Sequence, residues 1–96
     1  MHGVATEKVP GGKLLRVKVD YDDIIKHVSI TGDFFLHPEE SIEKIEAAMS
    51  GLRTNESESN IVGIIKEVAK EHGIELVGIS PEDIARTLKA AIKAED

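Results

Sequence analysis

The chain has 96 residues, a net charge of −6 and no cysteine, and these values exclude several classes of protein. The length gives room for one domain with one hydrophobic core. The excess of acidic residues argues against nucleic acid as a partner, because proteins that bind the phosphate backbone gain affinity by neutralising it. Without cysteine the chain can form no disulfide, thiolate nucleophile or Cys-ligated metal cluster.

The N-terminal segment 1–9 has no clear hydrophobic period, and we expect it to be a flexible lead-in within a single domain that spans 1–96. It lacks the apolar core of a signal peptide, and no apolar run in the chain is long enough to cross a bilayer. We therefore expect a cytoplasmic protein that contacts no membrane.

A turn and two strands are predicted next. Pro10-Gly11-Gly12-Lys13 forms the turn, and it does not predict a phosphate-binding loop because Leu14 stands where that motif needs Ser or Thr and a helix. Residues 14–20 then alternate as a half-buried strand, and 24–31 predict a second strand joined to the first as an antiparallel hairpin. The inward residues predicted for the two strands are Leu15, Val17, Val19, Val28 and Ile30.

Three helices and one more strand follow in the prediction. Pro38 fits the first position of a helix that ends near Gly51. A second helix begins between 57 and 59 and ends at His72-Gly73, and Gly63 inside it predicts a close contact because glycine weakens a helix. Residues 74–79 predict a third strand, and Ser80-Pro81 predicts the start of the third helix.

The predicted order is therefore strand, strand, helix, helix, strand, helix. This order favours an α+β fold in which three helices pack on one face of a small, three-stranded, mainly antiparallel sheet.

The junction Gly32-Asp33-Phe34-Phe35 holds two of the three aromatic residues in the chain. Successive side chains of an extended backbone alternate, so we expect one Phe to face the core. The other is either covered by a loop or helix of this chain or exposed as a partner surface. Asp33 could act as a general base, but no partner for it is identifiable, and a turn or capping role is favoured.

The four histidines do not predict a metal site. His27 and His37, with Glu39, would need the fold to bring them together, since their spacing is not that of a ligand pair. The residues by themselves therefore indicate no catalytic site and no metal site.

The segment Val9-Pro10-Gly11-Gly12-Lys13-Leu14, the junction Gly32 to Phe35 and the run from Pro38-Glu39-Glu40 to Gly51-Leu52 together resemble the C-terminal accessory domain of lipoate-protein ligases. The resemblance covers about residues 9–52. It implies a non-catalytic partner of a larger subunit that binds ATP, Mg and lipoate, forms lipoyl-AMP and transfers the lipoyl group to a lysine of an acceptor domain. This chain alone would bind no cofactor.

A free chain that begins at Met1 fits the split form of such a ligase, in which a small subunit forms a heterodimer with a separate catalytic subunit. The resemblance implies an interface with that subunit. We expect it at Gly12, Lys13, Gly32, Asp33, Phe34, Phe35 and Pro38.

Two other classes of protein also contain small α+β domains. A scaffold of iron–sulfur assembly conflicts with the absence of cysteine. A self-contained oligomerisation or regulatory module is the alternative to the ligase subunit, and it accounts less well for the Gly-Asp-Phe-Phe junction.

Overall fold

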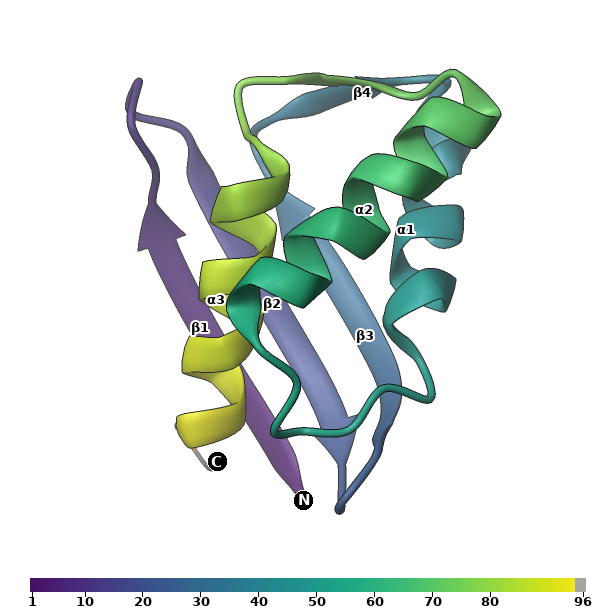
Figure 1. Cartoon of the computed structure of the whole chain (residues 1–96). Coiled ribbons are helices and arrows are strands. Elements are labelled where there is room, and N and C mark those ends of the chain that lie inside the picture. Colours follow the sequence, from purple (N-terminus) through teal and green to yellow (C-terminus); the bar gives the residue numbers. More distant parts are fainter. Residues whose placement is uncertain (95–96) are drawn as a thin grey trace.

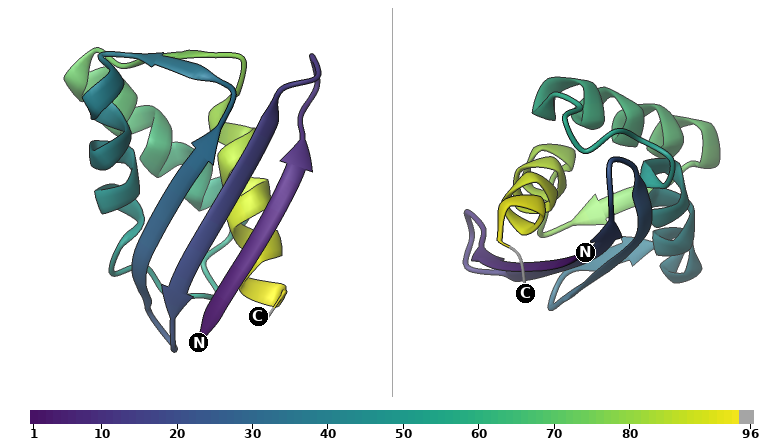
Figure 2. Two further views of the ribbon diagram at one scale, coloured as in Figure 1. Left: turned by 180° about the vertical axis from the view of Figure 1, so that it is seen from behind. Right: turned by 90° about the horizontal axis from the view of Figure 1, so that it is seen from below.

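An antiparallel three-stranded sheet forms one layer of the molecule, and three helices cover one of its faces (Figures 1 and 2). The computed structural model describes residues 1–94. The α+β class, the three-stranded sheet and the three helices on one face confirm the predicted fold. The elements are β1 His2–Lys8, β2 Leu14–Tyr21, β3 Ile25–Gly32, β4 Phe35–His37, the 3₁₀ helix η1 Glu39–Ser41, α1 Ile42–Met49, α2 Glu58–His72, β5 Glu75–Val77 and α3 Pro81–Lys93.

The central strand β2 pairs with β1 on one side and with β3 on the other. Its alternation is as predicted, because every second side chain points into the helix layer. The two predicted hairpin strands are paired so that Val17 lies opposite Ile30 and Val19 opposite Val28, which brings their apolar faces together. The fully buried large side chains include Leu15, Val17, Ile25, Val28, Ile45, Met49, Ile61, Ile65, Ile84 and Leu88.

The predicted flexible lead-in at 1–9 is wrong, because residues 2–8 form β1 along the full length of β2. The strand has no apolar period because α3 lies directly against its inward face. A Cβ on the buried Gly3 would stand 1.8 Å from the carbonyl oxygen of Ala91, so only glycine fits. Further along this face, Glu7 accepts hydrogen bonds from Arg86 and Thr87 of α3, so a polar residue also points inward.

The predicted third strand exists as β5, but it pairs with the short strand β4 rather than with the main sheet. The place beside β3 is already occupied by α1 and the turn after it. Glu46 of α1 accepts the backbone N–H of Ile30 at 2.7 Å, and Ile25 exchanges backbone hydrogen bonds with Gly51 and Leu52. The third strand of the main sheet is therefore β1.

The two longer helices begin and end where the sequence predicts. The hydroxyl of Ser57 accepts the N–H of Asn60 at the start of α2, and Gly73 ends the helix in the left-handed conformation. The helix α3 begins with a capping box, in which the Ser80 hydroxyl accepts the Asp83 N–H and the Asp83 carboxylate accepts the Ser80 N–H.

Two details of the helix prediction are wrong. Pro38 is not the first residue of an α-helix: its extended backbone precedes the 3₁₀ turn η1, and α1 begins only at Ile42. Gly63 marks no close contact with the described residues, since a Cβ built there would have nothing within 4 Å. None of the helices, within the described residues 1–94, is long and apolar enough to cross a membrane.

Candidate docking surface

Three segments that are far apart in the sequence meet at one end of the molecule. They are the turn between β1 and β2, the junction from β3 into β4, and β5 with the glycine after it; β4 lies across the top of Figure 1. We call five of their exposed or half-buried residues, together with Leu14 at the start of β2, the end surface. The end surface consists of Lys13, Leu14, Asp33, Phe35, Val77 and Gly78.

The two phenylalanines divide as the alternation rule predicts. Phe34 is half-buried and packs against the core, whereas 59% of Phe35 is exposed. On the same strand Leu36 turns inward and is 6% exposed, so the two sides of β4 are distinct. Phe35 is therefore the aromatic residue available to a partner.

Phe35 does not stand alone on this surface. It lies directly opposite Val77 in the β4–β5 pair, and residues opposite each other share a face of the sheet. Val77 is 42% exposed and Leu14 is 48% exposed. The end surface thus presents apolar side chains from three segments, and such side chains cost free energy while they remain in water.

Asp33 holds two of these segments together. Its carboxylate oxygen Oδ1 accepts the backbone N–H of Leu14 at 2.6 Å, and its own N–H donates to the Leu14 carbonyl at 3.2 Å. Gly32 makes this approach possible, because a Cβ there would lie 2.1 Å from the Leu14 carbonyl oxygen. Asp33 therefore bonds to backbone, but the predicted turn or capping role is wrong, because the donor is Leu14 of the neighbouring strand.

Lys13 joins the third segment to the other two. It is half-buried, and its aliphatic stem lies over Gly78, where a Cβ would come within 3.1 Å of Lys13 Cγ. Gly12 lies beside it in the turn, with a φ of +86° that favours glycine. The structure therefore brings Gly12, Lys13, Gly32, Asp33 and Phe35 to one end, while Phe34 contributes to the core behind them and the exposed Pro38 follows β4.

Sequence reasoning missed Leu14, Val77 and Gly78. Leu14 could have been found from the alternation of side chains along the strand. Because Leu15 points inward, Leu14 must point outward, on the polar side of the strand. Val77 and Gly78 carry no comparable signal, since their place beside Phe35 and Lys13 depends on the pairing of β4 with β5.

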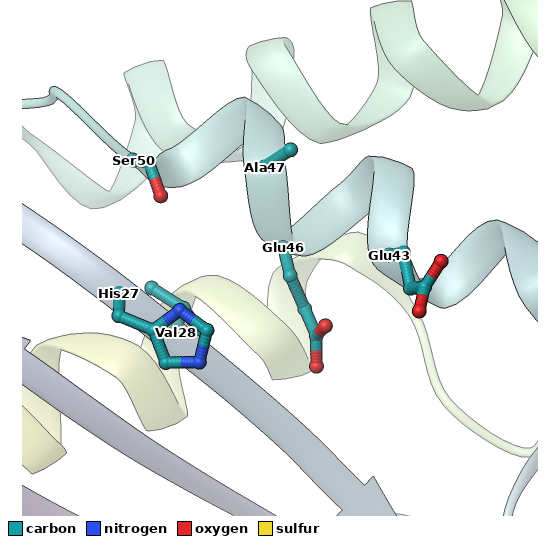
Figure 3. A pocket seen from close by; sticks show the side chains of 6 residues that line it. All are labelled: His27, Val28, Glu43, Glu46, Ala47 and Ser50. Carbon is teal, nitrogen blue, oxygen red and sulfur yellow. The ribbon is translucent and has the colours of Figure 1, made fainter.

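A second concave region lies between β3 and α1 (Figure 3). It has a volume of about 280 Å³ and is lined by His27, Val28, Glu43, Glu46, Ala47 and Ser50. Glu46 is already bonded to the Ile30 N–H. Among residues 1–94 no group of three His, Cys, Asp or Glu side chains could hold a metal ion, so neither this hollow nor the set His27, His37 and Glu39 forms a metal centre.

Two of the charged groups with shifted pKa values, Asp22 and Asp83, serve a turn and a helix cap. A hydrogen bond from the Ile24 N–H and then the Lys26 ammonium lower the pKa of Asp22. Burial raises the pKa of Asp83, but hydrogen bonds from Arg86 and from the N–H and hydroxyl of Ser80 outweigh it, so that the pKa is lowered overall. These arrangements stabilise structure and offer no acid–base pair for catalysis.

Comparison with known proteins adds three findings. The family described as bacterial lipoate protein ligase C-terminus matches residues 4–88. The chain is 36% identical over 77 residues to lipoate-protein ligase A subunit 2 of Thermoplasma acidophilum, a match that covers 79% of this chain and 77% of that protein.

The fold is also similar to a solved structure from an archaeal lipoylation system, described as a bi-partite lipoate protein ligase and its E2 lipoyl domain from Thermoplasma acidophilum. The TM-score is 0.71 at 32% identity, over 92% of this chain and 97% of that chain. The matched region includes all the segments that form the end surface.

Proposed function

We propose that this chain is the non-catalytic small subunit of a bipartite lipoate-protein ligase. The proposal proceeds from its family, because the chain belongs to the family of bacterial lipoate protein ligase C-terminal domains. Its partner is a large catalytic subunit, with which it forms a heterodimer. The observation that carries the proposal is the exposed pair Phe35 and Val77, because it lies beside the hydrogen bond from Leu14 to Asp33 that joins two of the segments on which the resemblance rests. Interface energy concentrates in a few such aromatic anchors.

The role we assign to the chain is conformational. The large subunit binds ATP, Mg and lipoate and joins lipoate to AMP with release of pyrophosphate; the lipoyl group then passes to a lysine of an acceptor domain. The docked small subunit stabilises the conformation in which the loops around ATP and lipoate are competent, which shifts a population without adding a catalytic group. The proposal places this ATP-dependent complex in the cytoplasm.

The test is lipoyl-AMP formation by the large subunit, measured with ATP, Mg and lipoate in the presence and absence of this chain. We expect product only when both chains are present, and a 1:1 complex on a sizing column. Unchanged activity with no complex would contradict the proposal. A stable homodimer without affinity for the ligase would instead support the oligomerisation module.

Lys13 has a separate prediction, because a lysine at the end surface could contact either the large subunit or an ATP phosphate. We expect Lys13→Ala to raise the dissociation constant of the complex about tenfold, as loss of one interface contact of moderate strength does. Lys13→Arg, which keeps the charge and a long aliphatic stem over Gly78, is the matched control. Unchanged association with poor lipoyl-AMP formation would show that Lys13 contacts the nucleotide.

A further inference from the structure

The face of the sheet opposite the helices is covered by no other part of residues 1–94, and it is the near face in the left view of Figure 2. The strand register places its side chains in rows. Thr6, Arg16 and Thr31 form one row, and Val4, Lys18 and Ser29 form the next. Lys8 lies opposite Leu14 in the row nearest the end surface.

This face of the sheet, which we call the open face, is basic in a chain that is acidic overall. Lys8, Arg16 and Lys18 are exposed on it, and the one carboxylate that the described part of the chain places there is Asp20, which lies 3.6 Å from the Nδ1 atom of His2. Elsewhere, Lys26, Lys66 and Arg86 each form an ion pair with a carboxylate, whereas six other Lys and Arg residues form none among residues 1–94. Within the described residues no carboxylate lies within ion-pair distance of Lys8, Arg16 or Lys18.

The neighbours of these cations explain why they are unpaired. Opposite charges in facing positions are the usual way to stabilise a charged sheet surface. Here the residues that face Arg16 are both Thr, and those that face Lys18 are Val4 and Ser29. Residues 1–94 therefore provide no carboxylate partner for these two adjacent cations of the central strand.

The open face is continuous with the end surface. Leu14 belongs to both, since it points outward from β2 and its N–H is bonded to Asp33. Lys8 lies opposite Leu14, and its Cε atom approaches Gly12 of the turn. From Leu14 to Lys18 the strand extends about 13 Å, at roughly 3.3 Å per residue.

The end surface is too small to be a complete interface. Stable complexes bury roughly 800 Å² and about 20 residues or more on each partner, which is more than the end surface and the other exposed residues of its three segments provide. A partner seated on Phe35 must therefore also cover neighbouring surface. A hollow of about 330 Å³, lined by Lys18, Asp20 and His27 among others, gives the open face a concave region.

Building on the proposed function, we propose that the open sheet face is the second part of the docking surface and receives an acidic surface of the large catalytic subunit. Phe35 and Val77 anchor the complex, and Arg16, Lys18 and Lys8 attract and orient the partner before contact. The negative charge on the rest of this chain repels an acidic partner, so that the approach is guided to this one face.

The two parts of the surface have different kinetic signatures. Charges at the rim of an interface act mainly on the association rate and its salt dependence, whereas buried anchors act on the dissociation rate. The experiment measures both rates for the two-chain complex, at low and at high ionic strength. The variants are Arg16→Glu with Lys18→Glu, the milder Arg16→Gln with Lys18→Gln, and Phe35→Ala.

The matched control reverses one arginine and one lysine at the other end of the molecule. Arg53→Glu with Lys93→Glu gives the same net charge, and both residues are exposed. Arg53 follows α1 and Lys93 ends α3, and both segments lie at the opposite end from β4 (Figure 1). Thermal unfolding of each isolated variant verifies that it is folded.

We expect the reversal on the open face to slow association at least about tenfold at low ionic strength, with little effect on dissociation. The glutamine variant slows association less than the glutamate variant does. For both variants, the difference in association rate from wild type shrinks at high salt. The control associates at least threefold faster than the open-face reversal. Phe35→Ala raises the dissociation rate at least about 30-fold, as loss of a binding hot spot does.

Association of the open-face reversal at the wild-type rate, or equal slowing by the control, would overturn the inference while leaving the docking of Phe35 intact. No binding of the wild-type chain at all would overturn both proposals. The wild-type chain could instead bind a short DNA duplex that the open-face reversal does not bind. That result would assign the open face to nucleic acid and would also overturn the inference.

Discussion

At the scale of single residues, neighbouring side chains on β4 have opposite environments. Phe35 faces solvent and Leu36 is buried, although both are large and apolar. The two positions therefore separate binding from folding within one strand.

We expect Phe35→Ala to change the free energy of unfolding of the isolated chain by no more than about 0.5 kcal/mol, because it removes an exposed side chain. Leu36→Ala, the matched control, should lower that free energy by about 2 kcal/mol or more, because it removes buried methyl groups and leaves a cavity. Urea unfolding of both variants measures the difference. Unfolding of the Phe35 variant would mean that this side chain belongs to the core.

Two glycines give a second contrast between residues. A Cβ at Gly63 would stand in open space on α2, whereas a Cβ at Gly32 would collide with the Leu14 carbonyl oxygen. We expect Gly63→Ala to raise the free energy of unfolding by about 0.5–1 kcal/mol, since alanine favours a helix more than glycine does. Gly32→Ala should lower it. Equal effects in thermal unfolding of the two variants would contradict this reading of the two sites.

At the scale of elements, a polar network joins β1 to the start of α3. Arg86 donates to Glu7 at 2.6 Å and to Asp83 at 2.7 Å, and these two hydrogen bonds raise the pKa of Arg86, the one to Asp83 most. The Thr87 hydroxyl also contacts Glu7. The apolar contact between β1 and α3 is small, because β1 presents Gly3 and Ala5 rather than large side chains. The polar network adds to this contact.

The network predicts a pH dependence of stability. The pKa of Asp83 is lowered in the folded chain from an ordinary value of 3.8, so the folded state favours the ionised form. The contribution of ionised Asp83 to the free energy of unfolding is complete above pH 3.8. It is lost as the pH falls below that value and passes through the pKa of Asp83 in the folded chain. We expect Asp83→Asn to reduce stability at neutral pH and to flatten the acid limb of the curve. Urea unfolding at several pH values measures this, and parallel acid limbs in both proteins would rule out the contribution of Asp83.

At the scale of the whole molecule, the proposed complex connects binding to stability. A partner that binds only the folded chain stabilises it by about 2.7 kcal/mol at a free concentration 100 times the dissociation constant. We therefore expect the melting temperature of this chain to rise when the large subunit is added in excess. The rise should be smaller for Phe35→Ala at the same concentrations. An unchanged melting temperature in the wild-type mixture would contradict the complex.

The sequence predicted the fold class and three of the six residues of the end surface, Lys13, Asp33 and Phe35, and the local predictions that the structure matches share a cause. Helix ends depend on a cap and the next few residues, as at Ser57, Gly73 and Ser80, so they can be read locally. The same holds for the alternation in β2 and for the division of Phe34 and Phe35 between core and surface. The family resemblance rests on motifs at residues 9–52 and was confirmed by a match over 4–88.

What the sequence by itself determined is therefore the hairpin strands β2 and β3, the ends of α2, the start of α3, the family and the residues that carry its motifs. Only the tertiary structure decided that residues 2–8 form a strand, because that strand is shaped by the close approach of α3 to Gly3. The same is true of the pairing of Phe35 with Val77 and of the open face beside them. Local rules act over one turn or one pleat, whereas these contacts join distant segments and depend on how the whole chain packs.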